Sequence, residues 1–442
     1  MRPLALKSRY KRCAHDLESR TVPLEETLGK YSRFVGNDHS IISAVRQYDL
    51  PWDGAIHLCR ARLRPSSCLS PLSSKPVISG SAFGKGTSRV AAEVSAICEL
   101  LERFSGIYRG DEERKRATYS ELGNIAIHPS ACTLFSEQQY CEREKWNLRE
   151  GKCNWVPEPF DEQRPIEWSP VWSLTHNEVK YVPTAYCYFG YPFDKTHDFI
   201  RPDSNGNSAG NNLEEAIVYA FLELVERECV ALWWYNRVRR PVVDLDSFEL
   251  DYVRQLRIAY DGIGRSLYAL DVTTTLSIPT FVAISESHDP MQHNHIFGFG
   301  AHFDPPQALL RAVTELNQFL PEIVAEESNP NRRKSPGSHF FLVPATDVVP
   351  TRCSDFPYAP TRDLRDDILS CINLVKGWGL EMLVLDQTRH EVGLPVVKVI
   401  VPGMRSWWAR FAPGRLYSMP VQLQWLKSAL PESQLNPEHL CL

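Results

Sequence analysis

Two short segments of the chain, residues 99–103 and 223–227, have the residue types and the spacing of a cation site. They read ELLER and ELVER, so each places two glutamates three residues apart, with an arginine directly after the second. A glycine precedes both at the same distance: Gly86 lies 13 residues before the first glutamate of its segment, and so does Gly210. Two matches at equal spacing predict a duplicated loop–helix unit.

Glutamates three residues apart lie on the same face of a helix. Like charges so close are mildly unfavourable unless a divalent cation neutralises them, and Mg²⁺ accepts hard carboxylate oxygens beside water and nucleotide phosphates. If the two helices pack face to face, four carboxylates converge on one metal site: Glu99, Glu102, Glu223 and Glu226. Ser95, one turn before the first glutamate, is placed to bind a phosphate or a metal-bound water. For either motif alone, the competing interpretation is a solvated helix face with acid–arginine pairs.

The loop before the first segment, residues 80–88, reads GSAFGKGTS and contains Lys85. It is not a Walker A motif, because GxxxxGK[ST] requires a glycine where Ser79 stands and a hydroxyl residue where Gly86 stands. A glycine loop with a lysine before a helix still suits an anion, through free backbone N–H groups and the helix dipole.

A third segment places Arg311, Glu315 and Gln318 on one helix face, at spacings of four and three residues. An arginine beside a nucleotide would stabilise the charge that develops during phosphoryl transfer. We therefore expect these three residues to form the catalytic face. The alternative is an ordinary arginine–glutamate pair on the surface.

Three long helices are predicted to position these groups, at residues 88–107, 213–235 and 306–327. The region at 110–200 has the irregular pattern of short strands. A helix at 364–378 should end at Gly379, a residue type favoured just after helices. The remaining elements are predicted as short helices at 22–31 and 41–48, and as strands at 55–63, 380–386 and 396–401.

A second repeat consists of LDVT at residues 270–273 and LDQT at 385–388, each preceded by a helical pattern and followed by a proline and a strand-like run. It predicts two helix–strand–strand units in pseudo-symmetric halves. We interpret it as architecture, with a catalytic role for Asp271 or Asp386 as the alternative.

Two tryptophan pairs, Trp233–Trp234 and Trp407–Trp408, are typical of a core or an interface. The alternative for such a pair is a wall of a peptide groove.

The composition excludes several classes of protein. Of 442 residues, 43% are hydrophobic and 23% are charged, which is typical of a globular chain. The net charge of -5 argues against nucleic acid as the main partner. No apolar run approaches the ~20 residues of a membrane helix, and no apolar stretch of a secretion signal follows the basic N-terminus, so we expect a cytoplasmic protein without a membrane partner. The 12 cysteines include no CxxC pair, so a structural zinc site has no support.

Four segments resemble the YcaO family, and within it the cyclodehydratases (D proteins) of azole- and azoline-containing ribosomal peptide biosynthesis. They are GKGTSRVAAEVSAICELLERFS, SNGNSAGNNLEEAIVYAFLELVERECVALWWYNR, GAHFDPPQALLRAVTELNQ and PGMRSWWARFAPGRLYSMPV. Spread from about residue 80 to the C-terminus, they cover over three quarters of the chain. The resemblance implies a mixed α/β (α+β) fold with pseudo-symmetric halves and long ExxE helices on mixed sheets. It also implies a catalytic domain at 80–442, with residues 1–79 as an N-terminal extension that is part of the core or packed on it.

The resemblance further implies ATP and Mg²⁺ as cofactors, bound without a P-loop. Carried over residue by residue, the metal ligands are Glu99, Glu102, Glu223 and Glu226, and the nucleotide or phosphate contacts are Lys85, Ser95, Asn212, Arg227 and Arg311. In the implied reaction, a Cys, Ser or Thr side chain of a ribosomal precursor peptide attacks the preceding backbone carbonyl. ATP phosphorylates the resulting oxyanion, and loss of phosphate leaves a thiazoline or oxazoline. His439 is a weak candidate for the general base.

Two alternatives stay open: backbone thioamidation or amidine formation at the same ATP site, and a non-catalytic subunit that only binds peptide. Family members often end in a proline-rich tail, whereas residues 435–442 contain one proline. The partners implied are a precursor peptide, a leader-binding protein that resembles ubiquitin-activating enzymes, a flavin dehydrogenase in a complex, and further copies of the chain. Residues 1–79 are too short for the leader-binding module and lack its zinc cysteines. We therefore expect a second protein to supply the affinity for the leader.

Overall fold

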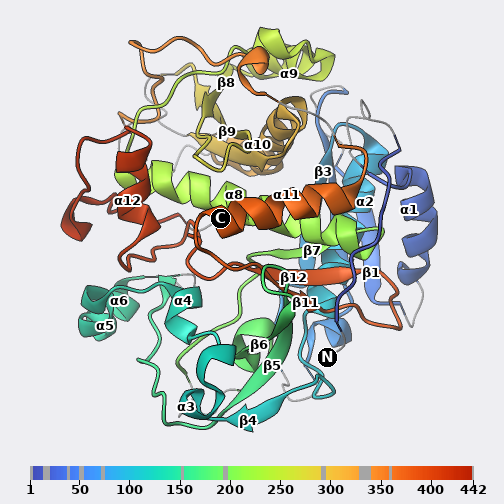
Figure 1. Ribbon diagram of the computed structural model, residues 1–442. Coiled ribbons are helices and arrows are strands. Elements are labelled where there is room, and N and C mark those ends of the chain that lie inside the picture. Colours follow the sequence, from blue (N-terminus) through green and yellow to red (C-terminus); the bar gives the residue numbers. More distant parts are fainter. Residues whose placement is uncertain are drawn as a thin grey trace.

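The computed structural model describes residues 3–12, 20–36, 40–48, 54–70, 75–150, 154–192, 198–289, 295–327, 340–357 and 361–440. Three antiparallel sheets surround one central helix, α8 (Leu213–Asn236), which crosses the middle of the molecule (Figure 1). This arrangement confirms the predicted α+β class. In the part of the chain that the structure describes, no helix is long and apolar enough to cross a bilayer.

The first sheet has the order β1 (Ile42–Gln47), β2 (His57–Leu63) and β3 (Ser81–Gly86). Helix α2 (Arg89–Ser105) packs on it, and α1 (Leu24–Tyr31) packs on α2. The helix predicted at 41–48 is therefore wrong. This short segment forms a strand because it can pair along β2, from Ile42 opposite Leu63 to Gln47 opposite Cys59.

The second sheet has the order β10 (Ile296–Ala301), β9 (Thr280–Ser287) and β8 (Arg265–Asp271). Helix α10 (Pro305–Glu327) covers β10 and β9, and α9 (Asp251–Gly262) packs against β8. These elements form the upper part of the molecule in Figure 1.

The third sheet has the order β4 (Lys115–Ala117), β5 (Ile166–Ser173), β11 (Leu383–Asp386), β12 (Val396–Ile400) and β7 (Asn207–Ala209), and β6 (Glu178–Pro183) pairs with β5. The region predicted as irregular and strand-rich supplies three of these strands, and five short helices besides. They are α3 (Tyr119–Leu122), α4 (Pro129–Thr133), α5 (Glu137–Cys141), α6 (Arg143–Arg149) and α7 (Thr184–Cys187).

Helix α8 is apolar on nearly all sides, as expected for a helix enclosed by other elements. It packs against β12, β7 and β10, and against α11 (Leu364–Gly377) and α12 (Arg415–Gln422). Trp233 and Trp234 near its end are 0% and 4% exposed, so this pair belongs to the core.

The second repeat forms two matching units, α9–β8–β9 and α11–β11–β12, as the sequence predicts. In each, the aspartate accepts a hydrogen bond from the backbone N–H two residues later: Thr273 N to Asp271 at 2.9 Å, and Thr388 N to Asp386 at 2.9 Å. These bonds shape the turn after each strand, which supports the interpretation as architecture. Gly379 has φ of 68° directly after the end of α11, in agreement with its predicted place.

Candidate functional site

Three strand–helix units enclose a cavity of about 540 Å³. The units are β3–α2, β7–α8 and β10–α10, and each helix also contacts the strand of another unit: α2 contacts β7, α8 contacts β10 and α10 contacts β3. The units therefore close a ring, and the side chains on the inner face of each helix reach the same space. We call this space the polar cavity. The residues on its wall that matter most below are Lys85, Ser95, Glu99, Glu102, Glu223, Glu226, Arg227, His302, Arg311, Glu315 and Trp408.

The duplicated loop has the same geometry in both ExxE units. The side chain of Ser88 accepts a hydrogen bond from Ala91 N at the start of α2, and Asn212 accepts one from Glu215 N at the start of α8. A Cβ atom on Gly86 would lie 2.4 Å from the Cβ of Ala91, and one on Gly210 would lie 2.4 Å from Ala216 N. Glycine is required at both places because the loop lies directly against the first turn of its helix.

The four glutamates of the ExxE motifs all line the polar cavity. Each motif also holds its own arginine, through the pairs Arg103–Glu99 and Arg227–Glu223 at 2.5 and 2.9 Å. Glu102 accepts a hydrogen bond from Ala209 N of β7 at 3.0 Å, so it bridges two of the three units. The carboxylates are thus brought together by tertiary packing, while their arginines come from the same helical turns.

The second glutamate of each ExxE motif, Glu102 and Glu226, forms no ion pair among the described residues, whereas Glu99 and Glu223 do. Burial, reinforced by the charges of Glu223 and Glu99, raises the pKa of Glu102 to about 8. Burial and the charge of Glu315 raise the pKa of Glu226 to about 8 as well, and burial also raises the pKa of Glu223. Carboxylates that resist ionisation because they are buried, and because like charges lie nearby, are stabilised by a cation placed among them.

Helix α10 contributes a further part of the cavity wall. Lys85 Nζ of β3 lies 2.9 Å from a carboxylate oxygen of Glu315, whose other oxygen accepts a hydrogen bond from Phe299 N at 2.6 Å. The guanidinium of Arg311 stacks over the ring of Tyr219 at 4.8 Å, which aims a cation at the cavity from α10. Arg227, on α8, stacks in the same way over Trp407 at 3.7 Å.

Two of the predicted site residues lie elsewhere. Asn212 is not on the wall of the cavity: it caps α8, and its side-chain amide donates to Thr21 Oγ1 at 2.9 Å. Gln318 follows Glu315 by three residues, yet it does not line the cavity either. Their roles as nucleotide contact and catalytic residue stay predictions. His439, the weak candidate for the base, contacts Glu150 at 2.7 Å, stacks on Trp146 and is not part of the cavity wall.

Several wall residues were missed by reasoning from the sequence. His302 is buried, and its Nδ1 accepts a hydrogen bond from Asp304 N at 3.0 Å, so Nε2 carries the proton. Burial, with the nearby charge of Arg311, holds the pKa of His302 well below its usual value, so the ring is a neutral donor. Arg20 reaches the cavity from the N-terminal segment and lies 3.7 Å from Glu215. Neither residue belongs to a local pattern that could have revealed it.

The donor set fits Mg²⁺ and a nucleotide in its chemistry. Hard carboxylate oxygens, two of them on glutamates without an ion pair, suit a magnesium ion, and Lys85, Arg227 and Arg311 offer cations to phosphates. Among the described residues, no three acidic, histidine or cysteine side chains stand close enough to form a ready-made metal cage. This agrees with the internal pairs described above, since Glu99 and Glu223 each face an arginine.

Known proteins resemble this chain in sequence and in structure. An uncharacterized protein of Methanothermobacter thermautotrophicus is 26% identical over 364 residues, which cover 79% of this chain and 87% of that protein. A protein of Rhizobium leguminosarum bv. trifolii, described as uncharacterized and encoded in the tfuA 3′ region, is 25% identical, with coverage of 73% and 76%.

A heterocyclase solved in complex with substrate and cofactor superposes with a TM-score of 0.92 and 42% identity, over 99% of this chain and 59% of that one. The heterocyclase TruD gives a TM-score of 0.80 and 41% identity, over 100% of this chain and 56% of that one. This chain therefore spans less than two thirds of the length of either heterocyclase. The structure of YcaO from Methanopyrus kandleri, solved with AMPPCP and Mg²⁺, shares the fold at a TM-score of 0.61 and 22% identity, over 87% of this chain and 92% of that one.

The model of one protein family, described as YcaO cyclodehydratase, ATP- and Mg²⁺-binding, matches residues 83–405. This range begins in β3 and includes all three helices that enclose the polar cavity. The chain belongs to the YcaO family.

Proposed function

We propose that this protein is an ATP- and Mg²⁺-dependent cyclodehydratase that forms thiazoline or oxazoline rings from Cys, Ser or Thr residues of a ribosomal precursor peptide. The observation that carries the proposal is the polar cavity, where two ExxE motifs meet Lys85, Arg227 and Arg311. Membership of the YcaO family and the likeness to two heterocyclases support the same activity.

In this proposal the glutamates of α2 and α8 hold the metal, and the cations of the cavity wall hold the phosphates. Lys85 and Arg311 reach the cavity from β3 and α10, and Arg227 follows Glu226 directly on α8. We assign to Arg311 the stabilisation of charge on the transferring phosphoryl group; it lines the same cavity, and its contact with the ring of Tyr219 restricts its motion. Glu315 keeps Lys85 in place through their ion pair.

Bound ATP with Mg²⁺ would supply the phosphoryl group that turns the amide oxygen of the precursor into a leaving group. The chain's share of the work is to hold the reacting amide beside the cavity and to neutralise charge, as in other phosphoryl transfers. His302 adds a neutral N–H donor to the wall of the polar cavity.

We further propose that a separate leader-binding module raises the local concentration of the precursor at the cavity. The greater length of the two heterocyclases is compatible with such an addition. A cytoplasmic location is part of the proposal, and the nine cysteines that the structure describes are all unpaired, as in a reducing compartment.

The test is the mass of a candidate precursor peptide incubated with the protein, ATP and Mg²⁺, with and without its neighbouring gene products. Cyclodehydration removes one water molecule for each ring, and phosphate release should rise with the number of rings. Thioamidation would instead exchange oxygen for sulfur, and a peptide-binding subunit would leave the mass unchanged. Full cyclisation with tight, leader-dependent binding by this chain alone would contradict the need for a partner.

A further inference from the structure

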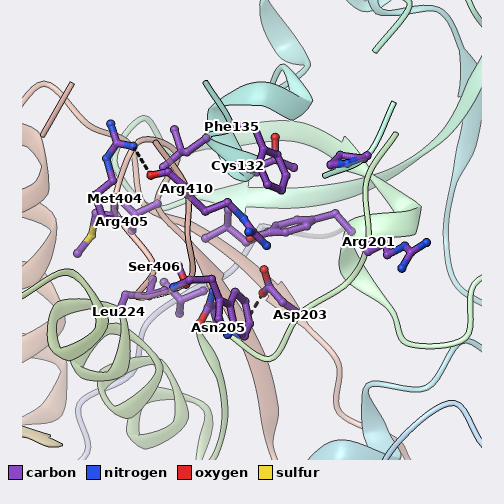
Figure 2. Close-up of a pocket in the computed structure, with 18 of the residues that line it drawn as sticks. Cys132, Phe135, Arg201, Asp203, Asn205, Leu224, Met404, Arg405, Ser406 and Arg410 are labelled. Atoms are coloured by element: carbon purple, nitrogen blue, oxygen red, sulfur yellow. Dashed lines mark hydrogen bonds between the residues drawn. The ribbon is translucent and has the colours of Figure 1, made fainter. Parts of the chain in front are cut away.

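A second, smaller cavity is shown in Figure 2, and it shares the lining residue Trp408 with the polar cavity. Its volume is about 70 Å³, and its wall comes from α4, α8, β12 and the loop at 402–410. We call it the side pocket. In Figure 2, Cys132 and Phe135 lie on one side of it, and Asp203, Asn205 and Ser406 lie on the other.

One wall separates the side pocket from the polar cavity. Trp408 lines both spaces. Along the chain, Leu224 faces the side pocket directly after Glu223 faces the polar cavity. Ser204 lines the polar cavity, while Asp203 and Asn205 on either side of it line the side pocket. A group held in the side pocket is therefore a neighbour of whatever reacts at the acidic cluster.

The side pocket contains polar atoms with unmet hydrogen bonds. Asn205 is only 7% exposed, and its Oδ1 finds no hydrogen-bond partner among the described residues. Trp408 Nε1 is buried and has no partner within the described part of the chain either. Buried polar groups are normally satisfied, so an open acceptor and an open donor on one pocket wall indicate a ligand that supplies both.

The chemistry of the wall favours an uncharged amide over an anion. Most of the cationic groups there are engaged by the chain itself: Arg201 pairs with Asp198 at 3.1 Å and lies over the ring of Trp155, and Arg410 lies over the ring of Phe135 and donates to Ala409 O at 3.2 Å. A terminal nitrogen of Arg405 donates to the carbonyls of Ala412 and Pro413 at 2.8 Å each, while its Nε has no partner among the described residues and adds a second open donor for a carbonyl. A backbone amide offers one N–H for an acceptor such as Asn205 Oδ1 and one C=O for a donor such as Trp408 Nε1. The volume has room for a few water-sized groups, and so for a peptide unit with a small side chain, not for a nucleotide.

We propose that the side pocket is a subsite for the precursor peptide, which binds the backbone amide and small side chain of the residue next to the one that is cyclised. This inference rests on the proposed function for the identity of the peptide. It also gives the second tryptophan pair two tasks: Trp407 is 3% exposed and packs under Arg227, while Trp408 forms the partition between nucleotide and peptide.

The loop that carries Trp408 is held rigidly. Glu228 of α8 is fully buried, accepts a hydrogen bond from Arg405 N at 3.0 Å and pairs with Arg415 of α12. The loop at Arg405 and the start of the following helix α12 are thereby tied to the same helix that bears Glu223 and Glu226. A subsite built on this loop keeps a fixed distance from the metal-binding face of α8, as alignment of an amide with a phosphate requires.

Photo-crosslinking tests the subsite without any need for turnover. The probe is the synthetic peptide acetyl-photoleucine-Ala-Cys-Gly-amide, in which the alanine can enter the pocket and the photoleucine labels its rim; it is irradiated with the protein in the presence of Mg²⁺ and a non-hydrolysable ATP analogue. We expect mass spectrometry to locate the label in the segments at 132–135 and 401–410. Cys132→Phe, which fills the pocket, should reduce labelling about tenfold. The matched control Cys141→Phe, on the exposed face of α5, should leave labelling unchanged.

A second variant keeps the test valid if the thermal melt shows that Cys132→Phe does not fold. Asn205→Ala keeps the space and removes the open acceptor, and should lower labelling about fivefold. Labelling in other segments, or equal labelling of the folded variants and the wild type, would overturn the subsite. If the wild-type protein carries the label in the pocket but removes no water from any precursor with ATP, the proposed function fails while the pocket assignment stands.

Discussion

The β3–α2 and β10–α10 units are built on one template and differ in the side chains that they send into the polar cavity. Ser88 and Asp304 precede the two helices, and each accepts the first helical hydrogen bond from an alanine N–H four residues later. A glycine lies four residues before Ser88 and another lies four residues before Asp304, and each is in close contact with two alanines of the helix that follows. The equivalent sets are Gly84 with Ala92 and Ala96, and Gly300 with Ala308 and Ala312.

The template explains which positions face the cavity. In both units the residues at positions 7 and 11 after Ser88 or Asp304 line the cavity. They are Ser95 and Glu99 in α2, and Arg311 and Glu315 in α10. Helix α8, counted from Asn212, does the same with Tyr219 and Glu223. Close packing of a strand glycine against the helix fixes which helix positions face the cavity. The residue type at the first of these positions then decides whether the unit places a hydroxyl, an aromatic ring or a cation there.

The largest effect is expected from Arg311→Ser, which gives α10 the residue that α2 has at this position. If Arg311 stabilises the transferring phosphoryl group, phosphate release with precursor peptide should fall by about 10³-fold, with the melting temperature unchanged. Arg311→Lys keeps the charge without the planar fork and should recover part of the rate. Near-normal turnover of the serine variant would return Arg311 to the surface-pair interpretation.

The shared template itself is tested by Gly84→Ala and Gly300→Ala. The new Cβ atoms would lie 1.9 Å from Ala92 O and 2.2 Å from Ala308 O, so strand and helix must separate. We expect each change to lower the free energy of unfolding by about 3 kcal/mol. Gly29→Ala in α1 is the control, because a Cβ atom there would meet no neighbour within 4 Å in the described part of the chain; it should stabilise the protein slightly. Unequal losses at Gly84 and Gly300, measured by chemical denaturation, would show that the two units are not equivalent.

The position fourteen residues after Ser88 or Asp304, the residue that precedes each helix, separates the two units most clearly. Glu102 lines the cavity and Gln318 does not. Glu102→Gln should weaken Mg²⁺-dependent nucleotide binding by at least about tenfold. The reciprocal change Gln318→Glu, which creates a third ExxE motif, should alter the affinity for the nucleotide by less than about twofold. Calorimetric titration with a non-hydrolysable analogue measures both, and a strong gain from Gln318→Glu would mean that α10 also offers this position to the metal.

The smallest effect is expected from Ser95→Ala, which removes the hydroxyl from the α2 unit. Loss of one hydrogen bond to a phosphate or a metal-bound water should raise the KM for ATP about fivefold. Ser105→Ala is the matched control on the same helix, because its hydroxyl donates to Leu101 O and is buried away from the cavity. Equal KM values for the two variants would remove Ser95 from the proposed nucleotide site.

Local patterns in the chain were sufficient for the three long helices around the cavity and for the acidic pairs. Helices α2, α8 and α10 were predicted close to their observed bounds, because a period of 3–4 residues survives in any tertiary setting. The same holds for the repeat at Asp271 and Asp386, since its hydrogen bonds span two residues. Spacing along one helix also placed each glutamate pair next to its own arginine.

Contacts between distant segments decided the rest. Strand β1 was mistaken for a helix because six residues carry too little periodicity, and only pairing with β2 settles their conformation. Asn212 caps α8, a task that depends on where the helix begins, and its role as a nucleotide contact stays a prediction. His302 and Trp408 reach the cavity from loops, whose course follows no repeat. The side pocket lies between segments near residues 132, 203 and 405, and such a space exists only once the chain has folded.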